Sequence, residues 1–311
     1  MVLYLIMICN QTANLMKSAF FEGAFLFMHD MKTVNQLIDF FVYSNTVIGL
    51  AAVGLVFTLA QVSGSIQVDN LLLLFVFSLI VCLYGWLKYK ESRDGSMPST
   101  THRQWYLANY PLAVLWMSIN AILVLVLSYQ VPKTHQFAIG ALAFFSVLYV
   151  VDFKYSIRRL ALVKPFYVAL IWSLLVILMT HDVWVQFSAD LVYLAVLLFL
   201  LLSVLLLLFE IKDQETDKAH QLTTWPIRFG VNRTKYLACF LAFVLILTAL
   251  YGYLTFERLL PLNIAVVVQS LVLFSLIKLT TAESNDRWYF FVLDGSLLLL
   301  PFFYFLHQLQ L

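Results

Sequence analysis

The feature that most constrains this chain is a series of apolar stretches, each long enough to cross a lipid bilayer. A spanning helix needs about 20 mainly apolar residues. Nine such stretches lie at 41–62, 70–88, 108–131, 135–153, 164–180, 188–209, 234–255, 259–279 and 288–308. They are continuous apolar runs without the in-and-out alternation of a transmembrane β-barrel. The sequence therefore predicts an all-α, polytopic membrane protein with nine transmembrane helices.

The composition agrees with this interpretation and excludes several other classes of protein. Of the 311 residues, 62% are hydrophobic and 12% are charged, against roughly 25% charged residues in ordinary soluble domains. A net charge of +2 gives no reason to expect nucleic acid as a partner. The three cysteines lie in apolar stretches without paired spacing, which excludes a disulfide framework and a Cys/His zinc site.

The basic residues between the stretches predict the orientation of the chain in the membrane. All but two of the 19 lysine and arginine residues, Lys133 and Arg258, lie before the first stretch or after the second, fourth, sixth and eighth. The positive-inside rule assigns that side to the cytoplasm. We therefore expect a cytoplasmic N-terminus and a C-terminus outside. The absence of an Arg- and Ser-rich transit peptide favours a bacterial cytoplasmic (inner) membrane.

The first thirty residues fit this scheme less well. Residues 1–9 are apolar but too short to span, and they lack the basic region of a signal peptide. From Met31 onward, apolar side chains recur at the spacing of one helix face, at Val34, Leu37, Ile38 and Phe41. This pattern predicts an interfacial helix and makes Met31 an alternative start. We therefore interpret 1–30 as an N-terminal extension of uncertain status and 31–311 as a single transmembrane domain.

Most of the chemically informative residues lie in the loop after the sixth stretch. Glu210, Asp213 and Asp217 stand at i, i+3 and i+7, so on a continuous helix they share one face. Three carboxylates on one face repel one another unless a cation is present. A small number of hard oxygen ligands suits Mg²⁺, which commonly also binds substrate phosphates. The pattern therefore predicts a Mg²⁺ site with a polyphosphate ligand, and the alternative is a solvated polar face between helices.

The residues around these carboxylates resemble a known motif. The matching residues read Glu210-x-Lys212, Asp213-x-x-x-Asp217 and Thr224-x-Pro226-x-x-x-Gly230. Together they are similar to the second aspartate-rich motif of the UbiA family of intramembrane prenyltransferases. The resemblance extends from about residue 31 to the end, and it implies a nine-helix bundle with a central cavity open to the cytoplasmic side. It also implies that the two aspartates act through Mg²⁺ on a prenyl diphosphate, whose prenyl group passes to an aromatic or other lipophilic acceptor.

Further candidates come from the same resemblance. Tyr155-Ser-Ile-Arg158-Arg159 resembles the family's Tyr-x-x-x-Lys element with arginine in place of lysine, which makes Tyr155 and Arg159 candidate catalytic residues. The alternative for this element is a tyrosine of the aromatic belt beside topology-setting arginines. Lys212 of the matched motif is a candidate for substrate binding, and position at the start of a predicted span adds Lys164 and Asn45. For the last two, the alternatives are a snorkelling lysine and a hydrogen bond to another helix.

The chain departs from the family after the second stretch, where the first motif, Asn-x-x-x-Asp-x-x-x-Asp, is expected. No register restores it. The three registers place Tyr84, Lys88 and Ser92, or Gly85, Tyr89 and Arg93, or Trp86, Lys90 and Asp94 at the three positions. Glu91 and Asp94 are the acids that remain in this segment. Lys88 and Arg93 are therefore candidates to bind the diphosphate directly, taking the place of one metal ion.

Three hypotheses for function follow. The first is a Mg²⁺-dependent prenyltransferase, and the second is a non-catalytic isoprenoid-binding or scaffold protein of the same fold that has lost the first motif. The third is a small-molecule transporter, which the lack of an inverted repeat disfavours. Asp294 is the one acid well inside a predicted span, so it is a further functional candidate whose alternative role is pairing with a neighbouring helix.

Overall fold

The structure, a computed structural model, describes residues 33–63, 69–93, 100–150, 161–181, 188–284 and 286–309. In these residues the secondary structure is helical, without strands. Seven helical segments are long and apolar enough to cross a membrane. They are α2 (Thr46–Ser63), α3 (Asn70–Arg93), α5 (Tyr110–Ser128), α8 (Ala189–Lys212), α11 (Val231–Thr255), the segment Glu257–Leu279 and the segment Trp288–Gln308.

Two of these seven segments are composite. The segment Glu257–Leu279 joins a 3₁₀ turn, η2 (Glu257–Leu259), to α12 (Leu260–Leu279). The last segment joins a π-helix, η3 (Trp288–Leu293), to α13 (Asp294–Ser296) and α14 (Leu299–Gln308). The other helices are α4 (Thr101–Ala108), α6 (Lys133–Val150), α7 (Lys164–Thr180), α9 (Gln214–Ala219) and α10 (Trp225–Phe229).

The predicted all-α class is confirmed, and seven of the nine predicted stretches coincide with the long apolar segments. The predicted stretches at 135–153 and 164–180 correspond to α6, whose described part ends at Val150, and to α7. With 17 residues, α7 is short for a complete crossing of the bilayer. The described residues therefore contain seven candidate spans by length and composition, and the count of nine stays a prediction.

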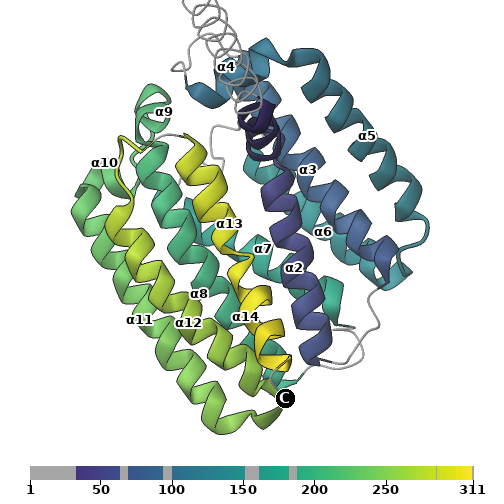
Figure 1. The fold of residues 1–311 in the computed structure, drawn as a ribbon, viewed down its shortest axis with the longest axis vertical. Coiled ribbons are helices and arrows are strands. Elements are labelled where there is room, and N and C mark those ends of the chain that lie inside the picture. Colours follow the sequence, from purple (N-terminus) through teal and green to yellow (C-terminus); the bar gives the residue numbers. More distant parts are fainter. Residues whose placement is uncertain are drawn as a thin grey trace, which may run out of the picture.

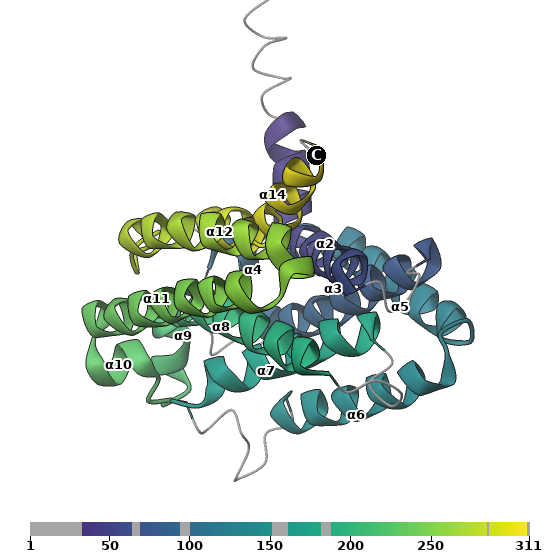
Figure 2. The same ribbon diagram turned by 90° about the horizontal axis from the view of Figure 1, so that it is seen from below.

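The helices form a bundle with α8 near its centre (Figures 1 and 2). α8 packs against α7 and α11, α11 packs against α12, and α3 packs against α2 and α5. Most of the leucine-rich α8 is buried, whereas α5 and α11 leave broad apolar faces exposed. Examples of these exposed side chains are Leu115, Ile122, Phe240 and Phe243. Because an apolar exterior of this extent suits lipid and not water, the packing agrees with an integral membrane protein.

Three breaks in the helices shape the interior. A helix over residues 33–43 is separated from α2 at Asn45, whose φ of 63° is the left-handed conformation that asparagine tolerates. α8 ends at Asp213 before α9 begins. In the C-terminal segment, Pro301 cannot donate to the carbonyl of Leu297, so helix α14 is offset from α13. The short helices α4, α9 and α10 gather at one end of the bundle, opposite the C-terminus (Figure 1).

Candidate functional site

A cavity of about 280 Å³ lies at the end of the bundle where the short helices gather. Residues from α2 to α4, α7 to α9 and the start of the C-terminal segment line it. Its wall combines apolar side chains with a concentration of charge that is unusual inside a membrane protein. The charged lining residues are Lys88, Glu91, Arg103, Lys164, Glu210, Lys212, Asp213, Asp217 and Asp294.

The structure brings most of the predicted site residues to this one cavity. Those that line it are Asn45, Lys88, Lys164, Glu210, Lys212, Asp213 and Asp217. Arg93 is not among the lining residues, and its guanidinium donates instead to the hydroxyl of Tyr89 at 2.8 Å. Tyr155 and Arg159 lie outside the described residues, as does the predicted extension 1–30.

The side of α3 that faces the cavity selects one of the three registers. Tyr84, Lys88 and Ser92 line the cavity. In the next register, Gly85 packs toward Met117 on α5, and in the third, Trp86 is 52% exposed on the outside. In this register, α3 presents the ammonium group of Lys88 to the cavity, at the position where the first aspartate-rich motif would have a carboxylate. Glu91, one turn further along, is the carboxylate that α3 contributes to the lining.

Lysine side chains neutralise the carboxylates around the cavity. Lys164 Nζ lies 3.0 Å from Glu210 Oε1 and 3.3 Å from Asp217 Oδ2, and both carboxylates are almost completely buried. Lys88 Nζ lies 3.1 Å from Glu91 Oε2. Burial without such partners would strongly disfavour the ionised carboxylates. Lysine therefore occupies the position between Glu210 and Asp217 where the sequence predicted a metal ion.

Asp213 differs from its two neighbours because its carboxylate is more open to the cavity. Its side chain is 36% exposed, and its contact with Lys212 Nζ is long, at 3.4 Å. Lys212 also lies 3.6 Å from Asp286 Oδ1, so its charge is shared between two acids. Burial would raise the pKa of Asp213, but Lys212, Lys164 and Lys88 outweigh it and hold the pKa below its usual value. The carboxylate of Asp213 is therefore ionised and remains available to bind a metal ion.

The fit of these donors to Mg²⁺ is limited. In the part of the chain that the structure describes, no three histidine, cysteine or acidic side chains converge closely enough to hold a metal ion. Glu210 Oε2 is buried without a hydrogen-bond partner among the described residues. Together with Asp213, this oxygen suits one Mg²⁺ whose other ligands are water and substrate phosphate oxygens. A second ion on the α3 side would face Lys88, so the donors fit one ion and not two.

Sequence reasoning missed one residue of the site, His102. It is the second residue of α4, and its backbone N–H donates to Asp286 Oδ2 at 2.7 Å. The ring lies against the rings of Tyr106 and Phe290, with centroid distances of 4.8 and 5.4 Å. Burial, followed by Lys88 and Lys212, lowers the pKa of His102 well below its usual value, so the ring is neutral. No sequence spacing indicated this, because only the fold brings α4 to the cavity.

Replacing Lys164 with methionine is expected to lower the free energy of unfolding by about 3 kcal/mol, because two buried carboxylates lose their cation. Adding Glu210→Gln and Asp217→Asn should recover most of the loss. The measurement is reversible denaturation in mixed micelles. Lys218→Met is the matched control, since Lys218 pairs with Glu215 on an exposed face and should contribute less than about 1 kcal/mol. Equal stability of the two single variants would contradict the buried pairing.

Comparison with known proteins agrees with this geometry. The sequence profile of the UbiA prenyltransferase family matches residues 92–300. No curated protein sequence matches the chain. A UbiA homolog from Archaeoglobus fulgidus bound to GPP and Mg²⁺ is 14% identical with a TM-score of 0.52, over 83% of this chain and 98% of that one.

Two further solved structures are similar. The same Archaeoglobus fulgidus homolog bound to DMAPP and Mg²⁺ is 14% identical with a TM-score of 0.54, covering 84% of this chain and 98% of that chain. A digeranylgeranylglyceryl phosphate synthase is 15% identical with a TM-score of 0.53, covering 88% and 99%. At these identities the likeness to the solved structures shows the fold.

Proposed function

Because the chain belongs to the UbiA prenyltransferase family, we propose that it transfers a prenyl group from a prenyl diphosphate to an aromatic or other lipophilic acceptor in the membrane. The observation that carries the proposal is the cavity, in which the ammonium groups of Lys88, Lys164 and Lys212 lie beside an apolar wall. Such a wall suits an isoprenoid tail, and the lysines suit its diphosphate. Solved structures of the same fold are bound to GPP or DMAPP with Mg²⁺.

In this proposal, two sets of residues hold the diphosphate. Lys88, Lys164 and Lys212 bind its oxygens directly. Asp213 and Glu210 would hold one Mg²⁺, and Asp217 fixes Lys164 in position through their ion pair. Bound there, Mg²⁺ would act as a Lewis acid on the phosphate oxygens. Tyr155 and Arg159 remain proposed catalytic residues on the strength of the family motif.

The chain's own side chains account for the rest of the chemistry. As the bond between the prenyl C1 and the diphosphate oxygen breaks, negative charge grows on the diphosphate and the preorganised lysines stabilise it. The aromatic side chains of Tyr84, Trp172, Phe209 and Phe290 line the cavity. Aromatic faces stabilise a nearby cation, and the apolar wall keeps water from the allylic carbon.

The proposed placement in the membrane follows the loop charges. We place the N-terminus in the cytoplasm, the C-terminus outside and the cavity on the cytoplasmic side of a bacterial inner membrane. A nine-helix domain spanning residues 31–311 is part of this proposal. In support, α4 and α9 contribute lining residues to the cavity and gather with α10 at one end of the bundle (Figure 1), and the loops on the predicted cytoplasmic side carry most of the basic residues.

Product formation tests the proposal. Purified protein in nanodiscs receives geranyl diphosphate labelled in the prenyl group, Mg²⁺ and a lipid extract of the native membrane as the source of acceptor. We expect the label in a new lipophilic product, formed by the wild type and not by Asp213→Asn. The same assay is repeated with longer labelled prenyl diphosphates. Label recovered only as the unreacted donor, for every donor tested, would contradict transferase activity.

A second candidate function is a non-catalytic isoprenoid-binding or scaffold protein of the same fold. The observation that favours it is Lys88, which replaces a metal-binding carboxylate on the cavity side of α3. Such a protein would bind prenyl diphosphate through the lysines and release no pyrophosphate. The two candidates therefore differ in turnover and agree in binding.

A further inference from the structure

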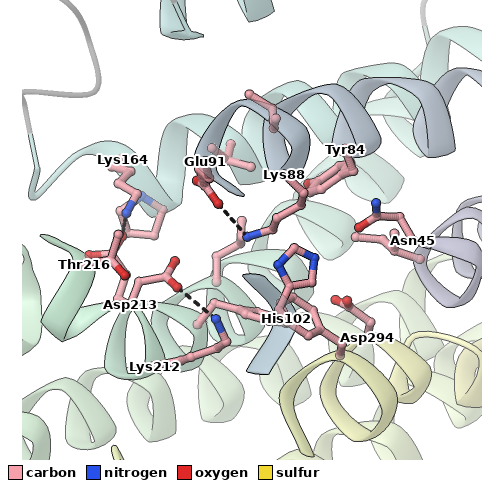
Figure 3. A pocket seen from close by; sticks show the side chains of 18 of the residues that line it. Asn45, Tyr84, Lys88, Glu91, His102, Lys164, Lys212, Asp213, Thr216 and Asp294 are labelled. Carbon is pink, nitrogen blue, oxygen red and sulfur yellow. Dashed lines mark hydrogen bonds and ion pairs between the residues drawn. The ribbon is translucent and has the colours of Figure 1, made fainter. Parts of the chain in front are cut away.

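The charged and polar lining residues of the cavity fall into two groups (Figure 3). Lys164, Thr216 and Asp213 lie on one side, and Lys88 and Glu91 lie between the two groups. Asn45, His102 and Asp294 lie together on the other side. The function proposed above uses only the first side and the middle. We call Asn45, His102 and Asp294 the polar pole. Asn45 and Asp294 were candidates from the sequence, but the proposed function gives the pole no role.

The polar pole offers hydrogen-bond acceptors. His102 Nε2 is buried without a hydrogen-bond partner among the described residues, and the backbone of Tyr43 faces the ring. We assign the neutral ring's N–H to Nδ1, toward the Tyr43 carbonyl, which leaves a lone pair on Nε2. Leaving a buried acceptor without a donor costs stability unless a ligand supplies one.

The other two members of the polar pole are also acceptors. Asn45 Nδ2 donates one of its two N–H groups to the hydroxyl of Tyr106 at 3.2 Å, and its amide oxygen is an acceptor. Asp294 is buried, lines the cavity and directly follows the π-helix η3. Its carboxylate makes no hydrogen bond to another described side chain. Interruptions of this kind in a helix often position a functional side chain.

The nearest cations are already engaged elsewhere. Lys88 and Lys212 are paired with Glu91 and Asp213. Their Nζ atoms lie over the ring of Phe290, 5.5 and 4.8 Å from its centroid. They separate the polar pole from the carboxylates of α8 and α9. Within the pole itself, a ligand group meets the acceptor atoms of Asn45, His102 and Asp294.

We propose that the polar pole binds the reacting end of the acceptor substrate, and that this end is a hydrogen-bond donor, a hydroxyl or an amine, without a carboxylate. The inference rests on the proposed function, since it assigns the second substrate of the same cavity. A hydroxyl donates to His102 Nε2 or to Asp294, whereas a carboxylate at the same point meets acceptors and is repelled.

Binding of matched probes tests this assignment. The protein is placed in nanodiscs with geranyl S-thiolodiphosphate, a donor analogue that does not ionise, and tritiated 4-hexylphenol is measured by scintillation proximity. Unlabelled 4-hexylphenol, 4-hexylanisole and 4-hexylbenzoate compete for the site. We expect the anisole and the benzoate to compete at least about tenfold more weakly than the phenol, because the first lacks the donor and the second adds a charge.

Two variants and one control locate the effect. His102→Phe keeps the ring packing and removes the lone pair, so the Kd of 4-hexylphenol should rise about tenfold. Asp294→Asn adds a donor, so the difference between phenol and benzoate should narrow. His181→Phe is the control, since His181 is buried outside the cavity, and it should bind the phenol as the wild type does.

Three results would overturn the inference. They are equal competition by the three probes, unchanged phenol binding in His102→Phe together with an unchanged phenol–benzoate difference in Asp294→Asn, and bound thiolodiphosphate without saturable phenol binding. Absence of thiolodiphosphate binding itself would instead overturn the proposed function, so the two failures are distinguishable.

Discussion

Lys88→Ala is expected to weaken the binding of geranyl S-thiolodiphosphate about 100-fold, equivalent to ~3 kcal/mol. Lys88 stands on the cavity side of α3 with its side chain 18% exposed, paired with Glu91 at 3.1 Å. Removing it deletes a cation for the diphosphate and leaves Glu91 beside the anionic ligand. Isothermal titration in nanodiscs measures the change.

Two further variants of α3 sharpen this expectation. Lys90→Ala is the matched control, because Lys90 is exposed and lies outside the lining, so binding should change less than about twofold. Lys88→Asp places a carboxylate on the cavity side, so binding should recover only at raised Mg²⁺ concentration. Equal affinities of Lys88→Ala and Lys90→Ala would show that α3 does not contact the diphosphate.

Asp213→Asn should lower the Mg²⁺-dependent rate of pyrophosphate release at least about 100-fold, a magnitude typical of losing one preorganised electrostatic group. Of the three carboxylates of this segment that line the cavity, Asp213 has the most open side chain, at 36% exposed against 3% for Glu210 and Asp217. The amide keeps the shape but loses the charge that Mg²⁺ requires. A Mg²⁺ titration of the release rate measures it.

The control for Asp213 is its exposed neighbour Glu215, which pairs with Lys218 away from the cavity. Glu215→Gln should keep the rate and the Mg²⁺ dependence of the wild type. The stability of Asp213→Asn should stay close to the wild type, since its one ion pair is long and shared. Unchanged release by Asp213→Asn would remove Asp213 from the metal site.

The sequence predicted much of this architecture because the bilayer limits the choices. Length and hydropathy were sufficient to locate the spans that became α2, α3, α5, α8 and α11, since a lipid-exposed backbone must satisfy its hydrogen bonds internally. The spacing of Glu210, Asp213 and Asp217 correctly grouped them at one cavity. That grouping depends only on local helix geometry, in which residues at i, i+3 and i+7 share one face.

Other features depended on contacts between distant segments and could not be predicted. The choice among three registers for Lys88 needed the orientation of α3, and the pairing of Lys164 with Glu210 and Asp217 needed α7 beside α8. His102 reaches the cavity only because α4 folds across the end of the bundle, where its N–H meets Asp286. Periodicity within one segment carries no information on such neighbours.

Pyrophosphate release tests most directly whether this cavity ionises a prenyl diphosphate. Lipid-reconstituted protein receives geranyl and longer prenyl diphosphates with the native lipid extract, with and without Mg²⁺, and Asp217→Ala serves as the variant. Release that requires both Mg²⁺ and Asp217 is the result we predict. Tight prenyl diphosphate binding without any release would contradict this ionisation and identify a binding protein that has an enzyme's fold.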